Sequence, residues 1–238
     1  MIFRQLFEHE SSTYTYLIAC EETRKALLID TVKSQLDVYL QLLKELNLQL
    51  EYVLDTHTHA DHITCASSLR DATGAKTLLG KEANSGCVSA SLQHGQTINI
   101  GFLVIEALYT PGHTDDSYCF LLKEKDQFLK EKDQFYLFTG DTLLIRGTGR
   151  TDFQNGNAAH QYDSLTNHLL LLPDNTLVYP GHDYKGWTVS TIGEERAYNP
   201  RLQVKDVNEY VTLMSNLKLP NPKLMDIAVP ANRACGKA

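Results

Sequence analysis

The run His57-Thr-His-Ala-Asp-His62 places three histidines and one aspartate within six residues. One residue separates it from Glu51–Asp55, a short segment with an apolar centre that is typical of a β-strand. Imidazole and carboxylate groups are the usual protein ligands of first-row metals. Layered α/β folds carry their sites in the loops that follow strands. The run therefore predicts a metal site at the end of a strand.

Three later loops repeat this arrangement of strand, small residue and metal-ligand residue. Each ligand candidate comes after a glycine, which lets the backbone turn sharply. The candidates are His113 after Gly112, Asp141 after Gly140, and His182 after Gly181. One such residue would be weak evidence, because isolated histidines are more often structural. Seven ligand-type residues at four strand ends favour a metalloenzyme.

Apolar periodicity along the chain predicts an α/β protein of two mixed sheets covered by helices. No linker or change in composition interrupts the chain, so we expect one domain over residues 1–238. The expected strands are Thr13–Cys20, Lys25–Asp30, Glu51–Asp55, Thr97–Ile100, Leu103–Leu108, Ser117–Leu122, Phe135–Phe138 and Thr176–Tyr179. The expected helices are Ser34–Leu46, His62–Ala72, Ala158–Leu172, a short one begun by a capping box at Thr191, and Asp206–Leu217. The residues after that helix, with three prolines, are expected to be extended.

Composition and charge indicate which partners and which cellular compartment suit the protein. The formal net charge of −7 argues against a nucleic-acid-binding protein. The N-terminal residues show neither a signal peptide nor a membrane span, so we expect a cytoplasmic protein that does not bind membranes. Five scattered cysteines without a Cys-x-x-Cys pair predict small buried side chains, no disulfide framework and a reducing compartment.

The segment Lys123–Leu129 is followed immediately by its repeat, Lys130–Phe135. We interpret this repeat as a tandem duplication in the tip of a hairpin, where insertions cost little free energy, and assign it no role.

The order His-x-His-x-Asp-His, then His113, Asp141 and His182, resembles the metallo-β-lactamase superfamily motif. The resemblance implies the αββα sandwich with a metal site at one edge. In that superfamily, His57, His59 and His113 would form one metal site. Asp61, His62 and His182 would form a second, with Asp141 between the two.

The surroundings of these residues resemble the persulfide dioxygenase (sulfur dioxygenase) family over nearly the whole chain. The matching segments are Thr56–Thr64, Gly140–Gln154, Tyr179–Tyr184 and the tail Met225–Asn232. The resemblance implies a dioxygenase that uses one Fe(II) per chain and O₂ to oxidise glutathione persulfide to sulfite and glutathione. His57, His113 and Asp141 would bind the iron as a two-histidine, one-carboxylate triad. His59, Asp61, His62 and His182 would orient these ligands without binding the iron.

The resemblance also places Arg150, Tyr184 and Arg201 near the glutathione pocket, where arginine can hold a carboxylate. Each has a structural alternative: Arg150 could instead brace the loop of Asp141, Tyr184 could cap a core, and Arg201 could lie on the surface. Thr148 departs from the family, which often has cysteine there. Related enzymes are often dimers, which allows a homodimer here.

Two other functions compete with this hypothesis. Glyoxalase II, a glutathione thioester hydrolase with two metal ions, shares the motif. It usually carries a longer helical C-terminal segment than the 56 residues that follow His182. A non-catalytic module with a retained fold is disfavoured because every ligand-type residue is intact.

Overall fold

The computed structural model describes residues 1–124, 134–222 and 224–237. The chain divides into two compact units. The first comprises Met1–Gln93, Ile98–Val104 and Pro220–Ala238, and the second comprises His94–Thr97 and Ile105–Leu219. The single domain expected over residues 1–238 stays a prediction. The duplicated segment falls mainly on residues 125–133, outside the described ranges.

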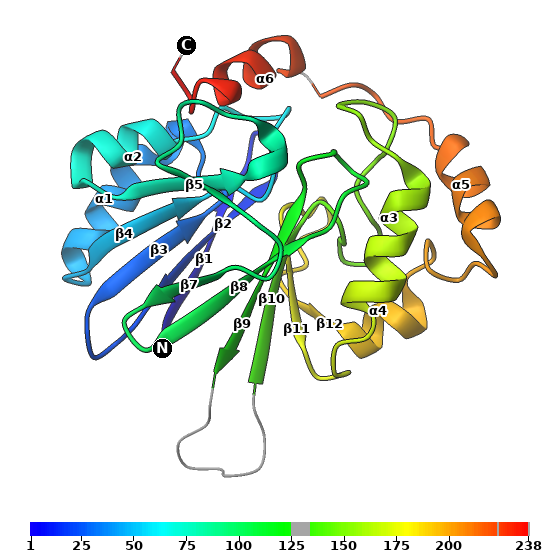
Figure 1. Cartoon of the computed structure of the whole chain (residues 1–238), viewed down its shortest axis with the longest axis horizontal. Coiled ribbons are helices and arrows are strands. Elements are labelled where there is room, and N and C mark those ends of the chain that lie inside the picture. The colour runs from blue at the N-terminus through cyan, green and yellow to red at the C-terminus, as the bar shows by residue number, and fades with distance from the viewer. Residues whose placement is uncertain (125–133, 223, 238) are drawn as a thin grey trace. The chain divides into compact units, whose positions relative to one another are not determined.

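The first unit is built on a six-stranded mixed sheet in the order β1-β2-β3-β4-β5-β6 (Figure 1). β1 to β3 are antiparallel neighbours, and β3 to β6 are parallel ones. Parallel neighbours end at the same edge, so the segments that follow β3 and β4 meet there. The strands are β1 (Ile2–Glu8), β2 (Thr13–Ala19), β3 (Lys25–Ile29), β4 (Gln49–Leu54), β5 (Lys76–Gly80) and β6 (Ala90–Leu92).

Two amphipathic helices, α1 (Leu36–Glu45) and α2 (Ala66–Thr73), lie on one face of this sheet. Their apolar faces form a core with the strands, in which Leu43 and Leu69 meet Leu28 and Val53. Helix α2 ends at Gly74, whose φ of 76° gives the left-handed cap that glycine adopts without strain. A third helix, α6 (Met225–Arg233), also belongs to this unit.

The second sheet has the order β12-β11-β10-β9-β8-β7, with β10 and β11 parallel. Its strands are β7 (Thr97–Ile100), β8 (Leu103–Tyr109), β9 (Tyr118–Glu124), β10 (Gln134–Gly140), β11 (Leu177–Pro180) and β12 (Ser190–Thr191). The helices α3 (Ala158–Ser164), α4 (Ile192–Tyr198) and α5 (Val207–Ser215) gather on one side of it. A π-helical turn, Leu165–Leu169, continues α3.

The predicted fold class, two mixed sheets with helices, is confirmed. Thr97–Ile100 has the predicted bounds, and most other elements differ by a few residues at their ends. Thr191 caps α4 as predicted, because its hydroxyl accepts a hydrogen bond from the Glu194 amide at 3.1 Å. The helix expected to start at His62 begins only at Ala66, because His62 to Thr64 form an irregular loop with partners elsewhere in the unit.

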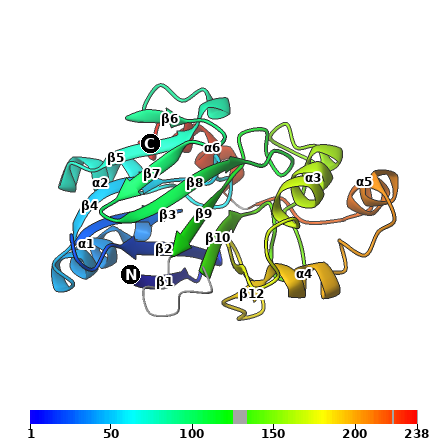
Figure 2. The same ribbon diagram turned by 60° about the horizontal axis from the view of Figure 1, so that its bottom comes forward.

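Two expectations for the first unit were wrong. Cys87 and Cys235 form a disulfide, so only Cys20, Cys65 and Cys119 are free, buried thiols. The spacing of the cysteines did not predict this disulfide, because the two partners lie 148 residues apart in sequence. The tail was expected to be extended, but Met225–Arg233 form α6, which contains Pro230, whereas residues 217–222 belong to no helix or strand. Figure 2 shows this helix beside the end of the sheet that carries β5 and β6.

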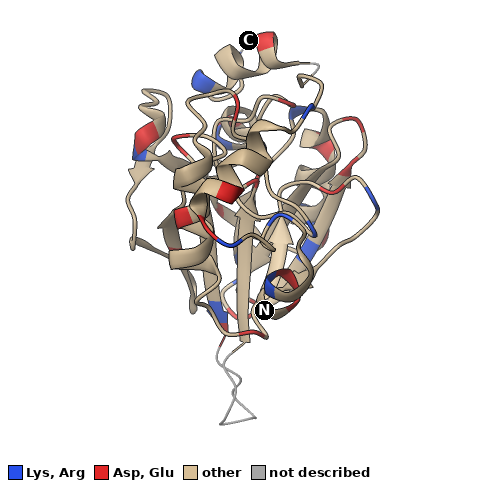
Figure 3. Ribbon diagram, turned by 90° about the vertical axis from the view of Figure 1, so that its right-hand side faces the viewer, with Lys and Arg blue, Asp and Glu red and all other residues tan. Residues whose placement is uncertain are grey.

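Acidic and basic residues are interspersed along the ribbon in Figure 3, as expected from a modest negative net charge. Among the described residues, none of the helices combines the length and apolar character needed to cross a bilayer.

Candidate metal centre

The histidine run of the first unit lies beside Asp30, at the edge where the parallel strands β3 and β4 end. Asp30 directly follows β3, and two residues separate the end of β4 from the run. The Asp30 amide donates to the Leu54 carbonyl at 2.9 Å. Asp30 has a φ of 54°, a left-handed conformation that aspartate tolerates better than most residues. Its carboxylate is buried and accepts hydrogen bonds from Thr56, which precedes the run, and from His59 within it.

Asp30 fixes the ring orientation of two histidines. Its carboxylate accepts hydrogen bonds from the Thr56 amide at 2.7 Å, the Thr56 hydroxyl at 2.9 Å and His59 Nε2 at 3.1 Å. Since the Thr56 hydroxyl proton points to Asp30, its oxygen accepts from His57 Nδ1 at 3.0 Å. Through this chain of bonds, the His57 ring is protonated on Nδ1 and keeps the lone pair on Nε2. A neutral imidazole nitrogen with a free lone pair is the atom that binds a metal.

The same carboxylate changes the proton affinity of His59. Burial disfavours the charged imidazolium, but the negative charge of Asp30 and its hydrogen bond outweigh burial. The pKa of His59 is raised to about 9. In the absence of a metal, His59 is therefore a positively charged partner of Asp30 at neutral pH.

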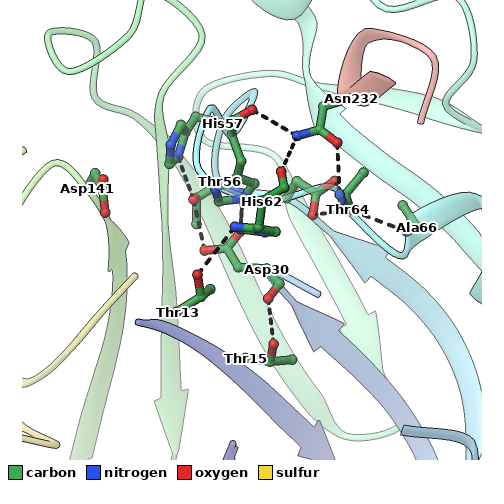
Figure 4. A network of polar contacts seen from close by, with 12 residues as sticks. Thr13, Thr15, Asp30, Thr56, His57, His62, Thr64, Ala66, Asp141 and Asn232 are labelled. Carbon is green, nitrogen blue, oxygen red and sulfur yellow. Dashed lines mark hydrogen bonds and ion pairs between the residues drawn. The ribbon is translucent and has the colours of Figure 1, made fainter. Parts of the chain in front are cut away.

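Asp61 and His62 form a second group in the same unit. The Asp61 carboxylate lies 2.8 Å from His62 Nδ1, and the Thr13 hydroxyl donates to Asp61 at 3.2 Å. Figure 4 shows Thr13 and His62 facing each other. Ligand atoms of His59, Asp61 and His62 all lie within 4.8 Å of one another. The first unit thus brings together the four ligand-type residues that the sequence motif predicted.

The second unit brings His113, Asp141 and His182 together at the ends of its own strands. The His113 Nδ1–H donates to the Arg150 carbonyl at 2.7 Å, so that Nε2 keeps the lone pair. That Nε2 lies 3.5 Å from Asp141 Oδ2, and Asp141 Oδ1 lies 2.6 Å from His182 Nδ1. Two ligand atoms bound to one metal are about 3 Å apart, so His113 and Asp141 fit a shared cation.

Glycines let these side chains approach one another. A Cβ at Gly149 would lie 2.7 Å from His113 Nδ1 and 2.4 Å from the Asp141 carbonyl oxygen. Both distances are shorter than side chains tolerate, so this position requires glycine.

The three residues expected near glutathione all lie in the second unit, and each has a partner there. The Arg150 guanidinium forms two hydrogen bonds of 2.6 Å with Asp152, whose carboxylate raises the pKa of Arg150. Arg201 is half-buried, donates to the Thr148 hydroxyl at 3.1 Å, and has its pKa lowered by burial. Tyr184 is 73% exposed, and its ring stacks on that of His182 with centroids 6.2 Å apart.

Two residues of this region were not identified from the sequence. Asp30 could have been found, since it is the last residue of the predicted strand Lys25–Asp30, and ligand-type residues near strand ends were the signal used for the other candidates. Asn232 could not, because it lies 170 positions from His62, to whose carbonyl it donates at 2.8 Å.

Two mixed sheets with helices, and histidines and aspartates in the loops after their strands, define a protein of the metallo-β-lactamase fold. A sequence profile of the metallo-beta-lactamase superfamily matches residues 10–84. His57, His59, Asp61, His113 and Asp141 fit the metal-binding site of this fold, and the donor nitrogens held by Thr56 and Arg150 suit such a site.

Proteins that are similar over nearly the whole chain identify the family within this superfamily. Persulfide dioxygenase ETHE1 of Mus musculus is 44% identical over 237 residues, which is 99% of this chain and 89% of that protein. The crystal structure of ETHE1 from Myxococcus xanthus has a TM-score of 0.92 at 55% identity, covering 99% of this chain and 100% of that one. The chain belongs to the persulfide dioxygenase family. A probable hydroxyacylglutathione hydrolase of Schizosaccharomyces pombe is more distant, at 34% identity over 90% of each chain.

Proposed function

We propose that this protein is a persulfide dioxygenase that oxidises glutathione persulfide. One persulfide, one O₂ and one water would give one glutathione, one sulfite and two protons, which balances atoms and charge. The observation that carries the proposal is the 44% identity to ETHE1 over nearly the whole chain. The donor set supports it, because each unit presents oriented nitrogen or carboxylate ligands.

We infer that one Fe(II) per chain is the metal, held by His57, His113 and Asp141. Two imidazoles and one carboxylate are the ligand set of non-haem iron oxygenases, and they leave coordination positions open. A bound Fe(II) would supply a place where the persulfide sulfur and O₂ meet. The protein supplies the orientation: Thr56 directs Nε2 of His57, and the Arg150 carbonyl directs Nε2 of His113.

The remaining ligand-type residues would support these three without binding the iron. His182 lies 2.6 Å from Asp141 and limits how that carboxylate can turn. His59 is bonded to Asp30, and His62 to Asp61. Groups in such positions typically change metal affinity or activity about 10- to 100-fold when they are removed.

Arg201 is the residue we favour for binding a glutathione carboxylate. A guanidinium has five N–H donors, so its bonds to Thr148 leave capacity for a ligand. Arg150 is already paired with the carboxylate of Asp152, whose negative charge disfavours a second carboxylate beside it. Arg201→Ala should raise KM for the persulfide about 10-fold or more while leaving kcat and iron content unchanged. Arg4→Ala, at an exposed arginine of the first sheet, is the matched control.

A glyoxalase II-like hydrolase with two metal ions is the second candidate. The observation that favours it is the group His59, Asp61 and His62, whose ligand atoms lie close enough for a second cation. In such an enzyme, a hydroxide held between two metals would attack a glutathione thioester.

Metal analysis combined with an oxygen electrode separates the two functions. Protein loaded anaerobically with Fe(II) should bind about one iron per chain, as a single triad requires. It should consume O₂ only when glutathione persulfide is added. Two metal ions per chain, hydrolysis of a glutathione thioester and no O₂ uptake would instead establish the hydrolase.

A homodimer and a cytoplasmic location, without nucleic-acid or membrane binding, stay predictions. Analytical ultracentrifugation and cell fractionation would test the first two.

A further inference from the structure

Asn232, on the last turn of α6, is hydrogen-bonded to the backbone of the histidine loop. Its side-chain amide donates to the carbonyl oxygens of His59 and His62, both at 2.8 Å. Its oxygen accepts from the Thr64 amide at 2.8 Å. Figure 4 shows the Asn232 amide reaching this loop from the C-terminal helix, and the side chain is buried.

These three bonds complete the backbone hydrogen bonding of an irregular segment. Residues 55–63 belong to no helix or strand, so the carbonyls of His59 and His62 have no regular ladder to join. A carboxamide can donate two hydrogen bonds and accept one, which matches the two carbonyls and one amide presented here. Leaving such buried groups unsatisfied costs free energy, so the loop conformation depends on this side chain.

The helix that carries Asn232 is itself fastened to the first unit. Cys235 is joined to Cys87 by the disulfide, and its carbonyl accepts from the Ser67 amide at 3.2 Å. The Gly236 carbonyl accepts from Lys33 Nζ at 3.0 Å. A covalent bond and these polar contacts therefore hold the end of α6 in place, so that Asn232 acts from a fixed support.

We propose that Asn232 is a positioning residue of the metal site. It sets the backbone path between His59 and Thr64, and thereby the direction in which the imidazoles of the run present their nitrogens. The claim that Asn232 affects metal binding rests on the proposed function, whereas the claim that it fixes the loop conformation does not.

The isosteric variant Asn232→Asp tests the proposal, with Asn232→Ser as a second variant that keeps a small donor and acceptor. Aspartate retains the acceptor for the Thr64 amide but sets a carboxylate oxygen against two carbonyls. Ala231→Gly is the matched control. It weakens the same turn of α6 and lowers Tm by about 2–4 °C, but keeps all three bonds.

Three readouts decide the outcome. In the metal-free protein, hydrogen exchange of the Thr64 amide should be at least 10-fold faster in Asn232→Asp than in wild type and in Ala231→Gly. Affinity for Co(II), measured against a chromophoric chelator, should fall about 10- to 100-fold in Asn232→Asp and also fall in Asn232→Ser, but not in Ala231→Gly. The visible spectrum of bound Co(II), which reports ligand geometry, should change in that variant and not in the control.

Unchanged Co(II) affinity and spectrum in Asn232→Asp would overturn the proposal, as would equal losses in Ala231→Gly. These readouts need neither iron nor substrate. A wild-type protein without O₂ uptake, together with the expected changes in Asn232→Asp, would reject the dioxygenase and keep the positioning role.

Discussion

Asp30 and His59 form a fully buried pair in which the carboxylate lies 3.1 Å from Nε2 of the imidazole. The aspartate also receives both hydrogen bonds of Thr56, which in turn holds His57. One carboxylate at the end of β3 therefore fixes two histidines that follow β4. The orientation of His57, the metal ligand that we propose for this unit, therefore depends on a residue outside the histidine motif.

Asp30→Asn tests this dependence. Asparagine has the same shape and tolerates the left-handed φ of 54°, so the fold should survive. Loss of the charge should lower metal affinity about 10- to 100-fold, because both histidines lose the partner that fixes their tautomers. A competition titration with a chromophoric chelator measures the effect, and Asp37→Asn, an exposed position on α1, is the control. Equal affinity in the two variants would show that Asp30 does not orient the site.

The same pair predicts how stability changes with pH in the metal-free protein. The pKa of His59 is about 9 in the folded state and about 6.5 when unfolded. Because the pKa is higher in the folded state, protonated His59 stabilises the fold fully below about pH 6.5. This stabilisation is lost as the pH rises through about 9. Urea unfolding should therefore show a loss of stability on the order of 3 kcal/mol over this range. Asp30→Asn should remove most of this pH dependence, and an identical pH profile in the variant would contradict the assignment.

Gly149→Ala should disturb His113 and Asp141 together. The added methyl would lie 2.4 Å from the Asp141 carbonyl oxygen and 2.7 Å from His113 Nδ1. We expect a loss of about 1–3 kcal/mol in unfolding free energy and weaker metal binding, because the backbone must shift. Gly147→Ala is the control, since its nearest neighbour would be Leu144 Cβ at 3.9 Å. Thermal unfolding and metal content of both variants measure the difference, and wild-type values for Gly149→Ala would refute the steric argument.

The disulfide should stabilise the protein by about 2–4 kcal/mol, because it closes a long loop in the unfolded chain. The variant Cys87→Ser with Cys235→Ser should lose this amount in urea unfolding, and reductant should lower the wild type to the same value. Thiol titration of the denatured, unreduced protein should find three thiols, those of Cys20, Cys65 and Cys119. Five thiols would exclude the bond.

The sequence predicted those parts of the site that follow from local order along the chain. His57, His113 and Asp141 each lie in the loop that follows a segment with strand periodicity, so their places at sheet edges could be derived. Asp30 was missed although the same reasoning applies, because a single aspartate at a strand end is common. The disulfide and the contacts of Asn232 join residues more than a hundred positions apart, and only the folded chain brings them together.

The disulfide has a further consequence for the integrity of the chain. Cys87 and Cys235 both belong to the first unit, and the whole second unit lies between them in sequence. The residues of the second unit therefore all belong to the covalent loop of chain that the disulfide closes. A single cut anywhere between residues 94 and 219, including the duplicated segment, would open this loop without releasing a fragment. On a denaturing gel, protein cut once by a protease would therefore give one band without reductant and two bands with reductant.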